Sequence, residues 1–445
     1  MVKPFNEKFY NGISLWGRAI RSIPGGNGLL SKRPDRYAPE IWPSYFSKCN
    51  GVIVEDLDGN SFIDMAQMSI GSSILGYANA ELNLAVTNII QDGINCTLNA
   101  PEEVYLAEKL IELNPFAAGV RFAKTGAEAM SIAIRIARAS SQKDKVLFSG
   151  YHGWSDWYLA TNIGNQNGLN AHLIPGLSTK GVPKGLANTA VPFNYNDVDH
   201  FESVVRDNPD AGVICIEGAR YDFPSIEFLN AVSLIAKKYN MVIVSDEITS
   251  GWRLTDGGVY KVNGFNPDIV VYAKALGGGY PISAVLGSEK IMYSAQETFM
   301  SSTMWTERVG FVAALTTIDI LTREQAWNKF INLGDRIGKG WLKLASKHGL
   351  DLSVSDFKPL ITMKLNYGDL NQKLATLFIQ EMLRRGYLAS TSVYLSYAHN
   401  ESIIDKYLES VDEVFFIMSS AIENKEIDQL LETKIRSDSF NRVTP

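Results

Sequence analysis

From about residue 65 to residue 310, short apolar runs rich in β-branched residues alternate with stretches of helical periodicity. This alternation constrains the fold most, because strands separated by helices pair in parallel and form a sheet covered by helices. We therefore predict an α/β fold with a mostly parallel central sheet flanked by helices. Its candidate strands are Gly119–Ala123, Lys145–Ser149, Gly212–Ile216, Met241–Ser245, Ile269–Ala273 and Ala284–Gly287.

One helix between these strands has a clear start. Apolar residues from Phe228 to Ala236 follow helical spacing, and Ser225 stands before them as a suitable N-cap. Outside the alternating region, residues 1–64 are expected to form an extended, partly β segment that joins a small domain. Residues 311–445 are expected to form that smaller α+β domain, so the large domain is predicted at 65–310.

Two features of the outer parts are distinct in the sequence. Two apolar runs joined across Asp58-Gly59 predict a β-hairpin in the N-terminal segment. A long helix is predicted around Ile403–Ile422 near the other end of the chain.

Composition excludes several classes of protein. Of 445 residues, 46% are apolar and 20% are charged, which is a globular composition, and a net charge of −6 gives no basic surface for nucleic acid. No apolar run is long enough to span a membrane, and the N-terminus lacks the apolar core of a signal peptide. Three scattered cysteines, Cys49, Cys96 and Cys215, predict neither disulfides nor a metal site and fit the cytoplasm.

Lys274 follows the apolar run Ile269–Ala273, and Gly277, Gly278, Gly279 and Pro281 come shortly after it. Burial at a strand end lowers the pKa of a lysine and leaves a nucleophilic amine. Such an amine forms a Schiff base with an aldehyde, and the glycines let a bulky ring approach the backbone. A solvated lysine in a loop is the alternative interpretation.

Two carboxylates also stand at predicted strand ends. Asp246 directly follows Met241–Ser245, and Glu217 ends the run before it. One crossover separates Asp246 from Lys274, which places both at the same edge of the sheet. A buried acid needs a partner, and a protonated pyridine nitrogen is one that would keep the ring electron-poor. Asp246 as a helix N-cap is the alternative.

A third and a fourth element complete the pattern. Thr125, Gly126 and Ala127 follow a strand and open a helix, whose free N–H groups and dipole favour phosphate. Tyr151 follows the strand Lys145–Ser149, where an aromatic ring can stack on a planar cofactor. Both features also occur without ligands. Together with the acid and the lysine, they indicate a pyridoxal 5′-phosphate site.

The chain resembles the class III aminotransferases of pyridoxal-phosphate fold type I over nearly its whole length. Within them it is most similar to the glutamate-1-semialdehyde 2,1-aminomutases. The motifs that carry the resemblance are GVIVEDLDGNSFIDM, KTGAEA, FSGYHGW, VSDEITSGWR and AKALGGGYPISA. The loop around Gly181–Lys184 and the sequence Ser396–His399 are similar to the aminomutases in particular.

The resemblance implies roles for residues around the cofactor. Lys274 would form the Schiff base and shuttle the proton, and Asp246 would hold the pyridinium nitrogen. Tyr151 would stack on one face of the ring and Ile248 would pack on the other. The phosphate would be bound by Thr125, Gly126 and Ala127, and Glu217 would lie in the same cluster.

The resemblance also implies a partner and a substrate contact. Thr303 would reach the phosphate of the neighbouring subunit's cofactor, so we expect a homodimer with its active site at the interface. Arg18 would bind a substrate carboxylate, and Arg21 lies close to it, both near Pro24-Gly25-Gly26.

Departures from the family pattern concern the substrate side. Thr303 is followed by Met304-Trp305-Thr306 where the family usually continues Phe-Ser-Gly. The usual Glu-Pro-Val is replaced by Glu217-Gly218-Ala219-Arg220, and Thr391 stands where the aminomutases have a glutamate. The sequence therefore supports the cofactor more strongly than any one substrate.

Three functions remain open at this point. The first is an aminotransferase that acts on a small aldehyde, ketone or keto-sugar, which Thr391 and Trp305 favour. The second is an intramolecular aminomutase, which Gly181–Lys184 and the Ala398-His399 pair favour. The third is a non-catalytic domain of this fold, which the joint presence of lysine, aspartate and tyrosine disfavours.

Overall fold

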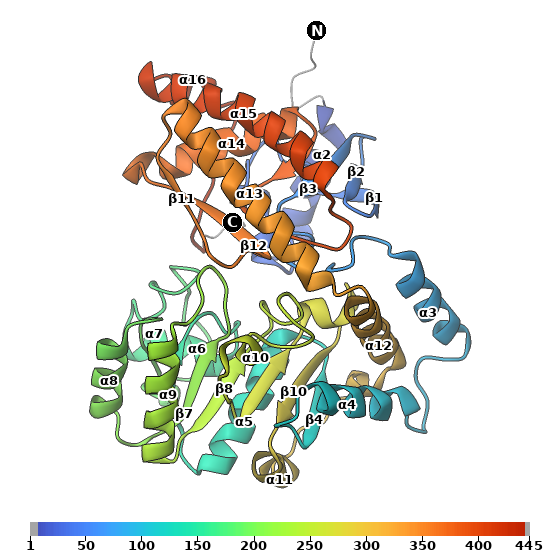
Figure 1. Ribbon diagram of the computed structural model, residues 1–445, viewed down its shortest axis with the longest axis vertical. Helices are drawn as coiled ribbons and strands as arrows, with labels where there is room; N and C mark the ends of the chain where they lie inside the picture. Colours follow the sequence, from blue (N-terminus) through green and yellow to red (C-terminus); the bar gives the residue numbers. More distant parts are fainter. Residues whose placement is uncertain (1–7, 441–445) are drawn as a thin grey trace. The chain divides into compact units, whose positions relative to one another are not determined.

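The computed structural model describes residues 8–440, and the chain divides into two compact units (Figure 1). One unit is residues 80–328, and the other combines residues 1–79 with residues 329–445. Both boundaries fall later than the predicted positions at 64 and 310. Helix α12 (Arg308–Arg323) packs against α3 (Ala80–Gln91) and α4 (Pro101–Leu113), so it belongs to the large unit. Residues 65–79 stay with the small unit, where Gly51 pairs with Tyr77.

The large unit is built on a seven-stranded sheet with the order β4-β10-β9-β8-β7-β5-β6. All pairs are parallel except those of β10, which is antiparallel to both of its neighbours. The strands are β4 (Gly119–Ala123), β5 (Lys145–Ser149), β6 (Ala190–Pro192), β7 (Ala211–Glu217), β8 (Val242–Asp246), β9 (Ile269–Tyr272) and β10 (Ser283–Gly287). The predicted α/β fold and all six predicted strands are confirmed. Only the short edge strand β6, which ends in proline, was not predicted.

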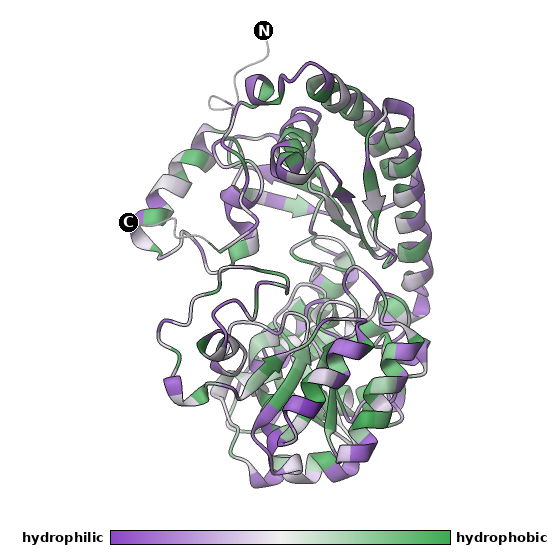
Figure 2. Ribbon diagram, turned by 90° about the vertical axis from the view of Figure 1, so that its left-hand side faces the viewer, coloured by the Kyte–Doolittle hydropathy of each residue, from purple (hydrophilic) through white to green (hydrophobic). Residues whose placement is uncertain are grey.

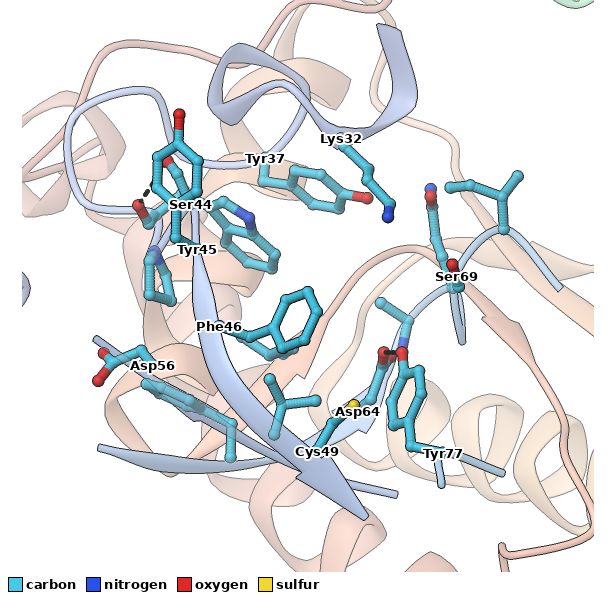
Figure 3. A pocket seen from close by; sticks show the side chains of 18 of the residues that line it. Lys32, Tyr37, Ser44, Tyr45, Phe46, Cys49, Asp56, Asp64, Ser69 and Tyr77 are labelled. Carbon is cyan, nitrogen blue, oxygen red and sulfur yellow. Dashed lines mark hydrogen bonds between the residues drawn. The ribbon is translucent and has the colours of Figure 1, made fainter. Parts of the chain in front are cut away.

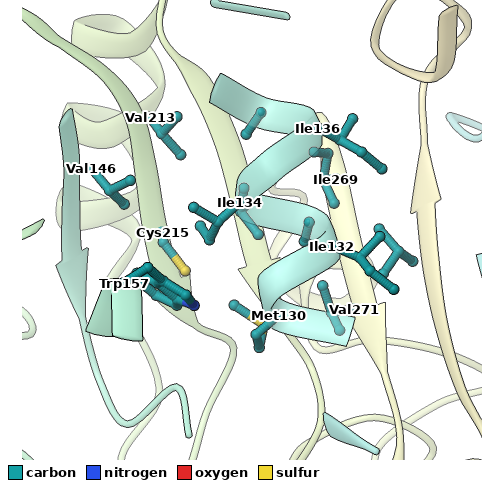
Figure 4. Close-up of a cluster of buried hydrophobic side chains, with 14 of the residues drawn as sticks. Met130, Ile132, Ile134, Ile136, Val146, Trp157, Val213, Cys215, Ile269 and Val271 are labelled. Carbon is teal, nitrogen blue, oxygen red and sulfur yellow. The ribbon is translucent and has the colours of Figure 1, made fainter. Parts of the chain in front are cut away.

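The central strands are buried on both faces, which explains their continuous apolar runs. Helix α5 (Gly126–Ser141) covers one face of the sheet and packs on β4, β7, β8, β9 and β10. Figure 4 shows Ile134 of α5 beside Val213 and Ile269 of the sheet, and Figure 2 shows the strands as the most hydrophobic part of this unit. This packing fixes the carboxyl ends of the strands, where the predicted site residues stand.

Helix α9 (Ile226–Tyr239) also begins as predicted. The Ser225 side chain accepts a hydrogen bond from the backbone N–H of Phe228 at 3.1 Å. The remaining helices of this unit are α6 (Asp156–Leu159), α7 (Thr161–Gly164), α8 (Val198–Asp207), α10 (Tyr260–Asn263) and α11 (Glu289–Glu297).

The small unit contains two antiparallel sheets, one of which gains a parallel strand from the C-terminal part. The first sheet comprises β1 (Phe46–Asn50), β2 (Ile53–Asp56), β3 (Ser61–Met65) and β13 (Tyr387–Ala389). The second comprises β11 (Leu352–Val354), β12 (Leu360–Leu365) and β14 (Ser392–Tyr394). Its helices include α13 (Ala326–His348), α14 (Asn371–Arg384), α15 (Glu401–Glu423) and α16 (Ile427–Leu430). The predicted hairpin and the predicted long helix are both present, as β2–β3 and α15.

The N-terminal segment differs from its prediction, because residues 10–22 form helix α2 rather than extended chain. Ile13, Trp16 and Ile20 follow helical spacing. This pattern is easily overlooked because the same segment contains two glycines, which disfavour a helix. The Asp58 carboxylate accepts hydrogen bonds from the backbone N–H groups of Asn11 and Gly12, so the start of the helix is capped by a distant residue. Such a cap is invisible to local sequence reasoning.

Two further findings concern residues 8–440 only. In this part of the chain no helix is both long and apolar enough to cross a lipid bilayer. The same residues contain no group of three or more histidine, cysteine, aspartate or glutamate side chains arranged to hold a metal ion.

Candidate active site

The carboxyl ends of β5, β7, β8 and β9 bring four predicted residues to one edge of the sheet. Glu217 and Asp246 are register partners on β7 and β8. The backbone N–H of Tyr151 donates to Glu217 Oε2 at 3.4 Å, and Lys274 follows the end of β9. The structure therefore brings these four residues to the same edge of the sheet, as the sequence predicts.

Lys274 is the first residue of a short 3₁₀ turn, Lys274–Gly277, and has the left-handed φ of 44°. This conformation costs a non-glycine residue about 1–2 kcal/mol, and such strain is concentrated at functional sites. Its Nζ donates a hydrogen bond to Thr249 Oγ1 at 2.8 Å. Burial, assisted by the Arg220 guanidinium, lowers the pKa of Lys274 to about 7. A large share of this amine is therefore uncharged and nucleophilic at neutral pH.

One of the glycines after the lysine is required by packing within the protein. Gly278 has a φ of 58°, and a Cβ at this position would lie 2.5 Å from Thr317 Oγ1 and 2.7 Å from Leu82 Cδ2. Packing within the protein alone therefore requires glycine at position 278.

Asp246 is 2% exposed and pairs with His152, whose Nδ1 lies 2.8 Å from Asp246 Oδ2. The other ring nitrogen, Nε2, lies 3.2 Å from the carbonyl oxygen of Ser149. Both ring nitrogens face acceptors, an arrangement that favours the doubly protonated imidazolium form. Burial lowers the pKa of His152, but the Cys215 sulfur and Asp246 outweigh burial and raise it well above its ordinary value.

The alternative role of Asp246 as a helix cap is not what the structure shows. Its Oδ1 accepts a hydrogen bond from the backbone N–H of Ile248 at 3.0 Å, but turns follow, and the next helix begins at Tyr260. The carboxylate is thus held at the strand end by a cation and a backbone donor.

The first turn of α5 has the properties of an anion site. Thr125 is its N-cap and forms a capping box with Glu128, because the Thr125 backbone N–H donates to Glu128 Oε2 at 2.8 Å. The N–H groups of Gly126 and Ala127 point out of the helix start and have no acceptor among the described residues. A Cβ on Gly126 would lie 3.0 Å from Ile248 Cδ1, so glycine permits the close approach of the Asp246 loop.

These residues fit pyridoxal 5′-phosphate. The helix start offers two backbone donors for a phosphate, and a buried carboxylate is available for the pyridine nitrogen. The half-buried Tyr151 and Ile248 offer apolar surfaces for a ring. Tyr151 is held edge-on to Tyr158, with ring centroids 5.8 Å apart at an angle of 82°. The amine of Lys274 completes the set of groups that the cofactor requires.

The remaining predicted residues are exposed in their own units. Thr303 is exposed in the short 3₁₀ turn Thr303–Thr306, although the neighbouring Trp305 Nε1 donates to Glu128 Oε1 at 3.4 Å. Arg18 and Arg21 are exposed on α2, in the small unit.

Sequence reasoning missed three side chains of the large unit that the geometry brings to the site. His152 directly follows Tyr151 in the sequence, so its position was a signal that could have been used. Thr249 lies three residues beyond Asp246 and contacts Lys274. Arg220 stood out only as a departure from Glu-Pro-Val, and it donates hydrogen bonds to Glu217 and Thr249.

The small unit contains a pocket of about 520 Å³ with aromatic walls (Figure 3). Tyr37 stacks on Trp42, with centroids 4.1 Å apart at an angle of 5°. The Asp64 carboxylate accepts a hydrogen bond from Tyr77 Oη at 2.6 Å. Lys32 extends its ammonium group into the pocket near the Tyr37 hydroxyl. Arg18 does not line this pocket.

Comparison with solved structures defines the class of protein. The structure of a FumI protein from Sphingopyxis sp. MTA144, in its internal aldimine form with pyridoxal phosphate, matches with a TM-score of 0.84 and 23% sequence identity. The match covers 97% of this chain and 99% of that chain. The fold is therefore that of the fold type I pyridoxal-phosphate enzymes.

Comparison of sequences gives the family. The model of the family "Aminotransferase class-III" matches residues 37–353. The 3-aminobutyryl-CoA aminotransferase of Cloacimonas acidaminovorans is 31% identical over 419 residues, which cover 91% of this chain and 97% of the relative. The glutamate-1-semialdehyde 2,1-aminomutase of Methanothrix thermoacetophila is 31% identical over 421 residues, covering 89% and 94%. The chain belongs to the class III aminotransferases, enzymes that use pyridoxal 5′-phosphate.

Proposed function

We propose that this enzyme moves an amino group to or from a small aldehyde, ketone or keto-sugar, with Lys274 as the residue that bonds to the cofactor. The observation that carries the proposal is the pair of groups at the sheet edge: a lysine amine with a pKa of about 7 and a buried carboxylate held by an imidazolium. A non-catalytic domain would have no need for a strained lysine with a lowered pKa.

The residues of the chain have distinct tasks in this proposal. When bound, pyridoxal 5′-phosphate supplies an aldehyde that bonds to amines and a pyridinium ring that withdraws electrons. Asp246 keeps the proton on the ring nitrogen, and the backbone of Gly126 and Ala127 binds the phosphate. Tyr151 and Ile248 hold the two faces of the ring. Lys274 Nζ, once freed, accepts and returns the proton of the substrate carbon.

The second candidate is an intramolecular aminomutase, and the similarity to the Methanothrix enzyme favours it. The two activities differ in what they require, because an aminotransferase needs separate amino donor and acceptor, whereas a mutase rearranges one molecule. Thr391 and Trp305 favour a substrate unlike that of the aminomutases.

A spectral titration separates these candidates. Purified protein loaded with cofactor is mixed with single amino donors, and loss of the visible absorption band is followed. We expect productive amino donors to abolish the visible absorption band. A new amine should form only after a separate carbonyl acceptor is added. Isomerisation of glutamate 1-semialdehyde with no added acceptor would favour the mutase instead.

We also propose that the active species is a homodimer. Phe299 is 85% exposed and Trp154 is 70% exposed, and both line one pocket together with Met300 and Trp305. Exposed apolar groups gathered in one place indicate a protein interface. Thr303 stands next to this surface in the chain, so a second copy of the chain would bring it to the neighbouring cofactor phosphate.

Phe299→Asp tests the dimer. A charge in an apolar interface is left without a partner, so we expect dimers in the wild type and monomers with little activity in the variant. Light scattering measures the mass. Leu234→Asp is the matched control, because Leu234 is 69% exposed on α9 and should change neither mass nor activity. An active wild-type monomer would exclude the proposal.

Arg18 remains our proposal for the substrate carboxylate, and Lys32 is the competing cation. A guanidinium binds a carboxylate through two parallel hydrogen bonds that an ammonium does not reproduce. Arg18→Lys should therefore raise KM for acidic substrates. The rise should correspond to a loss of about 1.5–3 kcal/mol of binding free energy, and it should be much smaller for neutral amines or amino sugars.

Lys32→Gln is the companion variant, measured by the same steady-state kinetics. If only Lys32→Gln raises KM for acidic substrates, the aromatic pocket of the small unit binds the carboxylate and Arg18 is a surface residue. If neither variant affects any acidic substrate, we would favour a substrate without a carboxylate.

For the location of the enzyme we propose the cytoplasm, because all three cysteines are free thiols.

A further inference from the structure

A chain of hydrogen bonds joins Lys274 to an arginine that follows β7. Lys274 Nζ donates to Thr249 Oγ1 at 2.8 Å, and Arg220 Nη2 donates to the same oxygen at 3.1 Å. Arg220 Nε in turn donates to Glu217 Oε1 at 2.8 Å. Thr249 is 2% exposed, so these groups interact with little screening by water. Two cationic side chains thus share one neutral acceptor.

The shared oxygen brings the two cations within reach of strong repulsion. Like charges within about 6 Å disfavour the charged form of each other. The guanidinium keeps its proton, so the lysine is the group that responds. The low pKa of Lys274, about 7, agrees with this geometry, with burial as the largest cause and Arg220 as the next. Of the other charged groups that face the amine, Arg253 also opposes its protonation, whereas Glu217 and Asp246 favour it.

We propose that Arg220 is a positioning residue that acts on Lys274 through Thr249 and keeps the lysine amine in its neutral, nucleophilic form. The inference rests on the proposed function, in which this amine bonds to the aldehyde of the cofactor. In that step the nitrogen lone pair forms the new bond to the aldehyde carbon. The aldehyde oxygen leaves with both amine hydrogens as water.

The local sequence explains how the arginine reaches this place. Glu217 is followed by Gly218-Ala219-Arg220, so two small residues separate the arginine from the end of the strand. A Cβ on Gly218 would lie 2.5 Å from Glu247 Oε2, so glycine lets the backbone pass over this buried carboxylate. Arg220 then turns back on Glu217 at the strand end, and this ion pair fixes the guanidinium beside Thr249.

The test is the pH dependence of acetylation of Lys274 by acetic anhydride in the full-length, cofactor-free protein, measured by mass spectrometry of its peptide. Arg220→Gln removes the cation, so the midpoint for Lys274 should rise by about one pH unit or more. Glu217→Gln removes a group of opposite sign, so the midpoint should fall. Arg206→Gln, at an exposed position of α8, is the matched control and should leave the midpoint unchanged.

An unchanged midpoint in a folded Arg220→Gln protein would overturn the proposal, because a merely structural arginine would not alter the titration of the lysine. If Arg220→Gln does not fold, Arg220→Met is measured in its place, and an unchanged midpoint in that variant overturns the proposal in the same way. Acetylation needs no cofactor. Failure of the proposed function would be seen separately, as loaded wild-type protein in which borohydride does not link the cofactor to Lys274.

Discussion

Lys274→Ala is expected to lower turnover by about 10⁴-fold, the largest effect of any single substitution in this chain. The variant loses the amine that bonds to the cofactor and the base that moves the substrate proton. The hydrogen bond to Thr249 holds this amine at the end of β9. Single-turnover kinetics of the loaded variant measure the loss of proton transfer directly.

Borohydride gives a second measurement on the wild type. Reduction should fix the cofactor to Lys274 and to no other lysine, which peptide mapping shows. Lys237→Ala, an exposed position of α9, is the matched control and should retain both colour and turnover. A colourless protein that takes up no pyridoxal phosphate, or a label on another lysine, would contradict the assignment. Added methylamine should partly restore proton transfer in Lys274→Ala, because a free amine can act as the missing base.

The large sheet was predictable because its central strands are buried on both faces. Burial of both faces demands continuous β-branched runs, and each predicted strand ends within one residue of the observed strand. The same logic predicted the candidate site, since the carboxyl ends of parallel strands meet at one edge. Lys274, Asp246, Glu217 and Tyr151 came together for that reason, although all four are far apart in the chain.

The unpredicted features depend on contacts between residues that are distant in sequence. The start of α2 is capped by Asp58, and local patterns do not reveal such a cap. The charge on His152 follows from the simultaneous approach of Asp246 and a backbone carbonyl group. The influence of Arg220 on the lysine requires a shared threonine oxygen. None of these can be derived from periodicity or composition, which report burial but not partners.

Asp246→Asn is expected to have the second largest effect, a fall in the rate of proton abstraction on the order of 10²–10³-fold. The amide has the same shape but lacks the negative charge that keeps a ring nitrogen protonated. It also leaves the buried His152 without its anionic partner, so the imidazolium should lose its proton. The phosphate contacts at the start of α5 are unchanged, so cofactor retention should weaken far less than the rate.

His152→Gln tests whether the rate depends on the negative charge of Asp246 or on the imidazolium that pairs with it. The glutamine amide can donate a hydrogen bond to Asp246 but carries no charge, so the carboxylate keeps its own charge for the ring nitrogen. We expect a smaller loss of rate than in Asp246→Asn, measured as solvent exchange of the substrate proton in deuterated water. If Asp246→Asn retains near-normal exchange, the aspartate only shapes the loop after β8. If His152→Gln instead slows proton exchange as much as Asp246→Asn does, the imidazolium rather than the carboxylate controls the protonation of the ring nitrogen. Both variants remove the positive charge of the imidazolium, whereas only Asp246→Asn removes the negative charge of the carboxylate.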